Sequence, residues 1–260
     1  MESLVGRRIL VVGASSGLGR ATAIECSRHG AEVVFSARRR DVLEAAVTDA
    51  GAGHAVVIDV LDPSSIERGV AEAVGVLGGL DGVIYTSGMS PMAPMAELTP
   101  NDWQAVFGVN TFGPNLVIST ALPHLSEDAV VVTVSSDSSE QPRHSLVPYA
   151  ASKRALEATM DGWRTEILGN RRFVTVILGP TMPTEFANSF TPEAFEAAIA
   201  HWQRQGLRTG IMQAEEVAHG LTACLAALYA APTFGIESLL LRAPEPEMPN
   251  EYSTLEDSPT

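Results

Sequence analysis

Three side chains suited to proton transfer lie close together in the second half of the chain. Ser136 ends a β-branched run, Tyr149 follows thirteen residues later, and Lys153 comes four residues after Tyr149. That last spacing places Tyr149 and Lys153 on one face of a helix that Pro148 is expected to begin. A phenol has an unperturbed pKa of about 10, and a neighbouring ammonium favours the phenolate and lowers that pKa. The pattern therefore predicts a tyrosine general acid/base, with the Ser136 hydroxyl orienting a substrate oxygen.

Lys153 is the single lysine of the chain. The other 16 of the 17 basic residues are arginine. An ammonium is a compact donor that can bind hydroxyl groups and relay protons, whereas a guanidinium is bulkier and effectively never loses its proton. Several serines neighbour Ser136, so the thirteen-residue interval to Tyr149 is what selects it.

A glycine-rich turn near the N-terminus predicts a phosphate-binding site. The run Gly13-Ala-Ser-Ser-Gly17-Leu-Gly19 lies between an expected strand and a helix that begins near Arg20. Glycines at such a turn let the backbone approach a pyrophosphate, whose charge the helix N-terminus stabilises. Tight packing is the alternative explanation, and the spacing differs from the G-x-G-x-x-G of many dinucleotide folds. The strand before the turn and the helix after it favour a dinucleotide site.

The end of the second expected strand carries Arg38, Arg39 and Arg40. An enzyme that prefers NAD usually has Asp or Glu there, to bind the ribose 2′-hydroxyl. Arginine can pair with a 2′-phosphate and offers no acceptor to a bare hydroxyl, so NADP (NADPH) is favoured over NAD. A solvated basic turn is the alternative.

The elements that must position these residues alternate along the chain. Helical patterns begin at Asp62-Pro63, Thr99-Pro100 and Thr191-Pro192, each with a capping side chain before a proline. Continuous apolar strands separated by helices are typical of a parallel sheet. We expect an α/β fold, a Rossmann-like, doubly wound, seven-stranded parallel sheet with helices on both faces. The expected strands are 8–12, 32–36, 55–60, 82–86, 129–135, 173–178 and 236–241.

Residues 1–242 are expected to form a single domain, since no Pro/Gly/Ser-rich linker divides them. Residues 181–213 form an insertion with a helical pattern over 192–205, a candidate substrate lid. Residues 243–260 hold five acids and no base, which predicts a disordered tail. Methionine and aromatic side chains suggest an apolar, adaptable substrate pocket, although ordinary core packing explains any one of them equally well. They are Met89, Met92, Met95, Met182, Phe186, Phe190, Trp202 and Met212.

The composition excludes several classes of partner. With 31 acidic against 17 basic residues the net charge is −14, which argues against nucleic acid and anionic membrane surfaces. The sequence shows no signal-peptide pattern and no apolar run of membrane-spanning length, so we expect a cytoplasmic protein.

Cys26 and Cys224 are interpreted as buried free thiols, and the six scattered histidines predict no metal site.

Taken together, the motifs resemble those of the short-chain dehydrogenase/reductase family over about residues 6–242. The resemblance implies an NADP-dependent oxidoreductase that interconverts a carbonyl (ketone or aldehyde) and an alcohol by hydride transfer, with Tyr149 as general acid/base. The matching motifs are GASSGLG at 13–19, Asp59-Val60, Asn110 in the run 109–113, Ser136, Tyr149-x-x-x-Lys153 and Gly179-Pro180-x-x-x-Thr184.

The resemblance also implies roles for individual residues. It implies a catalytic tetrad of Asn110, Ser136, Tyr149 and Lys153, in which Lys153 binds the nicotinamide ribose and Asn110 supports a proton-relaying water. Taken alone, Asn110 could instead satisfy a backbone kink near Pro114. Asp59 is expected against the adenine and Thr184 near the carboxamide. The implied cofactor-binding residues are Gly13, Ser15, Ser16, Gly17, Leu18, Gly19, Arg38, Arg39, Asp59, Val60, Ser87, Gly88, Tyr149, Lys153, Pro180 and Thr184.

The chain departs from the family pattern after the fourth strand. The usual Asn-Asn-Ala-Gly reads Tyr85-Thr86-Ser87-Gly88, so the hydrogen bonds of the second asparagine must come from Thr86 or be lost.

Two other functions stay open: a non-catalytic NAD(P)-binding sensor, and an isomerase or dehydratase of the same family. The alanines at 150, 151, 155 and 158 permit close helix packing in a homo-oligomer, a dimer or a homotetramer as in the family, although packing on the chain's own sheet is the alternative.

Overall fold

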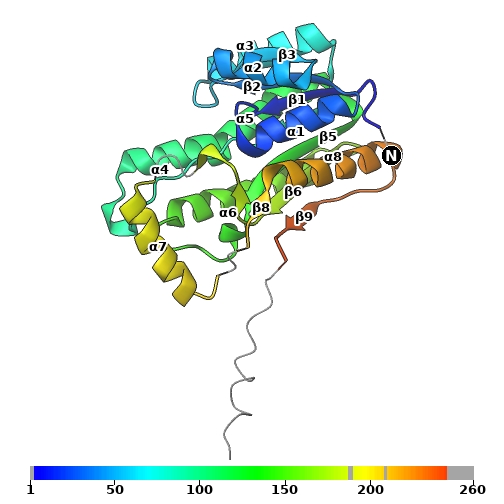
Figure 1. The fold of residues 1–260 in the computed structure, drawn as a ribbon. Helices are drawn as coiled ribbons and strands as arrows, with labels where there is room; N and C mark the ends of the chain where they lie inside the picture. The colour runs from blue at the N-terminus through cyan, green and yellow to red at the C-terminus, as the bar shows by residue number, and fades with distance from the viewer. Residues whose placement is uncertain (1–2, 187–189, 208–209, 245–260) are drawn as a thin grey trace, which may run out of the picture.

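The computed structural model describes residues 3–186, 190–207 and 210–244, and its centre is one parallel sheet (Figure 1). Seven strands lie in the order β3-β2-β1-β4-β5-β6-β9, with every neighbouring pair parallel. This confirms the predicted Rossmann-like sheet. The strands are β1 (Arg8–Val12), β2 (Glu32–Ala37), β3 (His54–Val57), β4 (Leu80–Tyr85), β5 (Leu125–Ser136), β6 (Arg172–Leu178) and β9 (Ser238–Leu241).

Helices cover both faces of the sheet, because alternate strand residues point to opposite sides. Ile9 and Val11 of β1 join the core under α1 (Gly17–Arg28), α2 (Arg40–Ala50) and α8 (Ala214–Ala230). Leu10 and Val12 join the core under α3 (Pro63–Leu77), α5 (Gly113–Ala121) and α6 (Val147–Glu166). In Figure 1, α1 and α8 lie side by side in front of the sheet. The continuous apolar runs therefore indicated strands that are buried on both faces.

The three predicted helix starts are confirmed with their caps. Asp62 accepts a hydrogen bond from the Ser64 backbone at 2.9 Å, at the start of α3. Thr99 forms a capping box with Asp102 at the start of α4 (Pro100–Phe107). The side chain of Thr191 caps α7 (Pro192–Arg204). The predicted helical pattern over 192–205 thus corresponds to α7.

The ends of the 181–213 insertion pair with each other, which the sequence did not predict. β7 (Thr181–Met182) and β8 (Met212–Gln213) form a separate two-stranded parallel sheet. Strands of two residues are too short to leave a periodic pattern. The expected strand over 55–60 was too long at its C-terminal end, because β3 ends at Val57.

A π-helix, Gly108–Phe112, interrupts the apolar helical segment between α4 and α5. Contrary to the sequence expectation, the segment Pro100–His124 is long and apolar enough to span a membrane by length and composition. Its most apolar window has a mean hydropathy of 1.2, and 44% of that window is buried. Cys26 is buried and Cys224 half-buried, and both are free thiols. Apart from residues 243 and 244, the predicted tail lies outside the described residues. Short 3-10 helices lie at Met95–Glu97, Leu122–His124 and Asp137–Ser139.

Candidate active site

The predicted site residues meet at one edge of the sheet. Ser136 is the last residue of β5, the glycine-rich turn follows β1, and Gly88 comes shortly after β4. The carboxyl ends of neighbouring parallel strands form one edge, which is where α/β folds bind ligands. Tyr149 and Lys153 come from the first turns of α6, with a proline at its start as predicted.

Ser136, Tyr149 and Lys153 lie together in the structure. The buried Ser136 hydroxyl hydrogen-bonds the Tyr149 phenol and also accepts a bond from the Ser138 backbone at 3.2 Å. The Lys153 ammonium lies 5.7 Å from the centre of the Tyr149 ring. It donates a hydrogen bond to the Val134 carbonyl at 2.7 Å. The spacing in the sequence thus corresponds to a cluster of three polar groups.

The pKa of Tyr149 is raised and the pKa of Lys153 is lowered relative to exposed side chains. Burial raises the pKa of Tyr149 to about 12, and the hydrogen bond from Ser136 opposes that rise. Burial lowers the pKa of Lys153 to about 8, against a smaller opposite effect of Glu157. The expectation that the ammonium lowers the pKa of the phenol is therefore wrong for the protein without ligand. The reason is that burial, the largest cause of both shifts, disfavours the charged form of each group.

Asn110 lies within the π-helix, and it is fully buried. Its Oδ1 accepts from the Met89 backbone N–H, and its Nδ2 donates to the Met89 carbonyl and to the Ser152 hydroxyl, each at 2.9 Å. Ser152 in turn donates to the Tyr149 carbonyl at 2.7 Å. Asn110 therefore joins the loop after β4 to the turn of α6 that carries Tyr149.

Sequence reasoning missed Tyr85, Thr111 and Ser152, which support this arrangement. The Tyr85 hydroxyl donates to the Val109 carbonyl at 2.6 Å, inside the π-helix. Thr111 donates to the Ser152 carbonyl at 2.9 Å. A π-helix changes the regular backbone pairing of an α-helix and is common at functional sites. The departure at Tyr85-Thr86 from the family motif was the one available signal in the sequence.

The glycine-rich turn needs its glycines for close packing. Gly13 has a φ of +98°. A Cβ at Gly19 would lie 2.2 Å from the Gly13 carbonyl oxygen, and a Cβ at Gly17 would lie 3.2 Å from the Thr184 Cα. Thr184 is thus beside the turn.

The same turn fits a phosphate group. The Ser16 side chain does not cap α1, and no acidic residue lies in the first turn of that helix. The N-terminal N–H groups of α1 are therefore not engaged by a side-chain cap, which leaves them available to an anion.

The other predicted cofactor-binding residues lie along the same edge. A Cβ at Gly88 would be 3.6 Å from the Lys153 Nζ, and one at Gly13 would be 2.8 Å from the Ser87 backbone nitrogen. Thr86 donates from Oγ1 to the Val12 carbonyl at 2.9 Å, so it supplies a hydrogen bond to the central sheet. The Asp59 carboxylate accepts a hydrogen bond from the Leu61 backbone N–H at 3.0 Å, and the neighbouring Val60 is buried. The Pro180 carbonyl accepts a hydrogen bond from the Met212 backbone N–H at 2.9 Å. Ser15 is half-buried, and Leu18 packs in a core cluster with Val134.

The basic turn after β2 contacts the insertion. Arg39 donates from Nη2 to both carboxylate oxygens of Glu185, at 2.8 and 2.6 Å. Arg38 is exposed beside this pair, and Arg40 makes a longer ion pair of 3.8 Å with Glu44. The turn is therefore more than a solvated basic loop.

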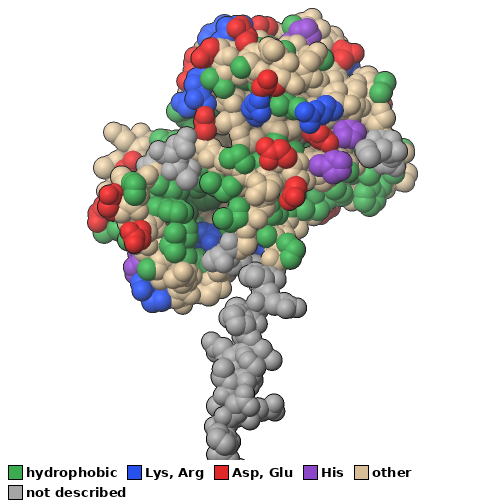
Figure 2. All heavy atoms as spheres, viewed as in Figure 1, with side chains coloured by type: hydrophobic (Ala, Val, Ile, Leu, Met, Phe, Trp, Pro, Cys, Tyr) green, Lys and Arg blue, Asp and Glu red, His purple; other side chains and the backbone are tan. Residues whose placement is uncertain are grey.

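Aromatic rings extend from Tyr149 into the insertion. Phe186 lies 4.8 Å from the Tyr149 ring, and Phe190 lies 5.4 Å from Phe186, measured between ring centres. The series continues through Phe195 to Trp202, whose indole donates to the His144 carbonyl at 2.9 Å. Hydrophobic side chains gather on the surface near α7 (Figure 2).

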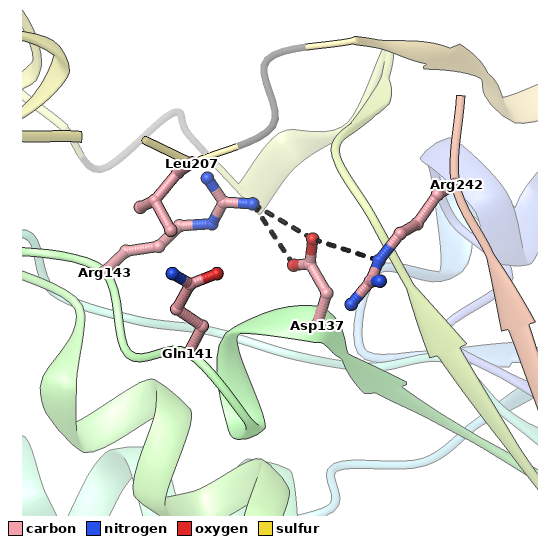
Figure 3. Close-up of a pocket in the computed structure, with 5 residues that line it drawn as sticks. All are labelled: Asp137, Gln141, Arg143, Leu207 and Arg242. Atoms are coloured by element: carbon pink, nitrogen blue, oxygen red, sulfur yellow. Dashed lines mark hydrogen bonds and ion pairs between the residues drawn. The ribbon is translucent and has the colours of Figure 1, made fainter. Parts of the chain in front are cut away.

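A pocket beside Ser136 is lined mostly by charged and polar side chains (Figure 3). Arg143 donates to both carboxylate oxygens of Asp137, at 3.2 and 3.1 Å, and the Arg242 Nε lies 3.9 Å from the same carboxylate. Gln141 and Leu207 complete the lining. Because Asp137 directly follows Ser136, these ion pairs fix the loop that leads from Ser136 to α6.

Comparison with known proteins shows which family the chain belongs to. A family model described as short chain dehydrogenase matches residues 7–194. The chain belongs to the short-chain dehydrogenase/reductase family. This confirms the family resemblance seen in the sequence. In the part of the chain that the structure describes, no three His, Cys, Asp or Glu residues are placed to hold a metal ion.

Relatives agree with this assignment. The short-chain dehydrogenase/reductase FrzI of a Cladobotryum species is 32% identical over 206 residues, 77% of this chain and 80% of that protein. The glycine betaine reductase ATRR of Emericella nidulans is 30% identical over 224 residues, which are 84% of this chain but 17% of that protein. The crystal structure of a dehydrogenase/reductase from Sinorhizobium meliloti has a TM-score of 0.77 and 26% identity, and the match covers 92% of this chain and 95% of that one.

Proposed function

We propose that this chain is an NADP-dependent oxidoreductase that interconverts a carbonyl compound and an alcohol. The observation that carries the proposal is the cluster of Ser136, Tyr149 and Lys153 beside the glycine-rich turn. A hydroxyl hydrogen-bonded to a phenol, with a buried ammonium 5.7 Å from the ring, is an arrangement that can deliver a proton to an oxygen.

Each residue has a separate task in this proposal. A bound nicotinamide supplies the hydride in reduction and accepts it in oxidation. The Tyr149 hydroxyl donates its proton to the carbonyl oxygen during reduction, so that the added hydride and proton give the alcohol. The Ser136 hydroxyl holds that oxygen. Lys153, next to Gly88, binds the ribose hydroxyls and returns a proton toward Tyr149, and Asn110 keeps the turn of α6 in place.

The pKa of Tyr149, about 12 without ligand, makes the protonated phenol the resting form. A protonated general acid is what carbonyl reduction requires at neutral pH. We propose reduction as the direction in the cell on the separate ground of the proposed cofactor. That cofactor is NADP, which cells usually keep reduced.

The residues that would hold the cofactor's phosphates are the glycine-rich turn with Ser15 and Ser16, and the arginines after β2. Arg38 and Arg39 are exposed at the carboxyl end of β2, where an adenosine 2′-phosphate would lie. Neither side chain offers an acceptor to a ribose hydroxyl. These residues support NADP over NAD as the cofactor.

The substrate is proposed to be apolar, because the aromatic series beginning at Phe186 adjoins Tyr149.

A homo-oligomer and a cytoplasmic location are also part of the proposal. Phe112 is 61% exposed and Leu116 is 39% exposed beside α6, and apolar side chains on one surface favour burial against a second copy.

The test is a panel of ketones and aldehydes assayed with NADPH and with NADH. We expect NADPH-dependent reduction of at least one apolar carbonyl compound. Arg38→Ala should weaken NADPH binding far more than NADH binding. Absence of both turnover and NADPH binding would contradict the proposed function, and equal losses for the two cofactors would contradict the 2′-phosphate assignment.

A further inference from the structure

Glu185 is an acidic residue that the structure brings to the proposed cofactor phosphate site from the insertion. It follows Thr184 directly, and its carboxylate accepts two hydrogen bonds from the Arg39 guanidinium. It also hydrogen-bonds Ser16 of the glycine-rich turn and attracts Arg38. The side chains of Arg39 and Glu185 are 50% and 46% exposed, so the pair lies at the surface.

These contacts coincide with the residues assigned to the phosphates. Arg38 and Arg39 are the proposed partners of the 2′-phosphate, and Ser16 belongs to the proposed pyrophosphate turn. A carboxylate and a phosphate present similar pairs of oxygens to a guanidinium. A bound 2′-phosphate and the Glu185 carboxylate therefore compete for the Arg39 guanidinium, whose Nη2 already donates to Glu185. Two anions this close also repel each other.

We propose that Glu185 is a specificity-determining residue that competes with the 2′-phosphate of the cofactor for Arg39. The inference rests on the proposed function, which assigns that phosphate to the arginines. A nucleotide with a 2′-phosphate must displace Glu185, whereas one with a bare 2′-hydroxyl leaves the ion pair intact. Glu185 thus narrows the difference in affinity between NADP and NAD.

The effect is moderate in size. Exposed ion pairs contribute little to stability, so a phosphate can displace Glu185. Removing the carboxylate charge is expected to tighten binding of a 2′-phosphorylated nucleotide by about two- to fivefold. The change is confined to ligands that carry the 2′-phosphate.

The experiment measures binding of two nucleotides by calorimetry, without any turnover. Adenosine 2′,5′-bisphosphate and adenosine 5′-monophosphate differ only in the 2′-phosphate. Each is titrated into the full chain as wild type, as Glu185→Gln and as Glu44→Gln. Glu44 is the matched control because it makes an exposed ion pair with the neighbouring Arg40 and loses the same charge. We expect tighter binding of the bisphosphate to Glu185→Gln alone, with no change for the monophosphate.

Two results would overturn the inference: unchanged affinity of Glu185→Gln for the bisphosphate, or an equal gain for both nucleotides. An equal gain would indicate that the Glu185 carboxylate repels the 5′-phosphate, which both nucleotides carry. The wild-type preference between the nucleotides tests the NADP assignment separately. If neither wild type nor Glu185→Gln distinguishes them, both the assignment and the inference fail. If wild type and Glu185→Gln distinguish the two nucleotides to the same degree, only the inference fails.

Discussion

Lys153 donates a hydrogen bond from its ammonium to the Val134 carbonyl, and the lysine side chain is 2% exposed. Val134 lies in β5, two residues before Ser136, so this bond fixes the ammonium beneath the proposed site. The ammonium is thereby positioned by the sheet and by α6 together. Burial of the ammonium disfavours its charged form, which lowers the pKa of Lys153.

The stability of the protein should therefore depend on pH through Lys153. Its pKa is about 8 in the folded chain, against 10.5 for an exposed lysine, so the unfolded chain binds more protons between these two values. The free energy of unfolding should rise with pH across this window, by up to about 3 kcal/mol. The measurement is the difference in unfolding free energy between wild type and Lys153→Met from pH 7 to about pH 10. A difference that stays constant with pH would contradict the burial of the charge.

Ser152 is predicted to act as a positioning residue. Ser152→Ala leaves one N–H of the buried Asn110 amide without its partner, which costs roughly 1–3 kcal/mol. Urea unfolding measures this loss. Turnover should also fall, with a larger effect on kcat than on KM, because Tyr149 lies in the same helical turn. Ser119→Ala is the control, since the exposed Ser119 only bonds the nearby Leu116 carbonyl. Equal stabilities of the two variants would exclude the role of Ser152.

Gly19 is predicted to tolerate no side chain. The Cβ of Gly19→Ala would lie 2.2 Å from a backbone oxygen, so the turn must shift, and NADPH binding should be lost or weakened at least tenfold. Gly75→Ala in α3 is the matched control, because nothing lies within 4 Å of its Cβ. It should stabilise the fold by about 0.5–1 kcal/mol. Thermal unfolding and NADPH fluorescence check both variants, and normal NADPH binding by Gly19→Ala would refute the packing argument.

The sequence predicted the sheet and the site cluster because their signals are local. Strands buried on both faces appear as apolar runs, and a capping side chain before proline marks a helix start. Ser136, Tyr149 and Lys153 were found from spacing alone, since one helix and one strand end set their positions. For the hydrogen bond to the sheet, the sequence left two alternatives, that Thr86 supplies it or that it is lost, and Thr86 does donate to the Val12 carbonyl.

Other features depend on contacts between distant segments, and local patterns do not encode them. The π-helix around Asn110 is stabilised by Tyr85 from β4, and its residues look like an ordinary buried helix. The β7–β8 pair joins residues about thirty positions apart. The raised pKa of Tyr149 results from burial, which spacing does not reveal. The Arg39–Glu185 pair links an expected basic turn to a residue of the insertion that no sequence motif marks.

The most direct measurement is single-site replacement of the phenol, Tyr149→Phe, assayed with NADPH and a carbonyl compound that the wild type reduces. The variant keeps the ring that packs on Phe186 and removes only the hydroxyl. NADPH binding should remain within about twofold of the wild type, whereas kcat should fall by roughly 10²–10⁴-fold, as expected for loss of a general acid. Wild-type turnover by Tyr149→Phe, with NADPH bound normally, would contradict the assignment of Tyr149 as the proton donor.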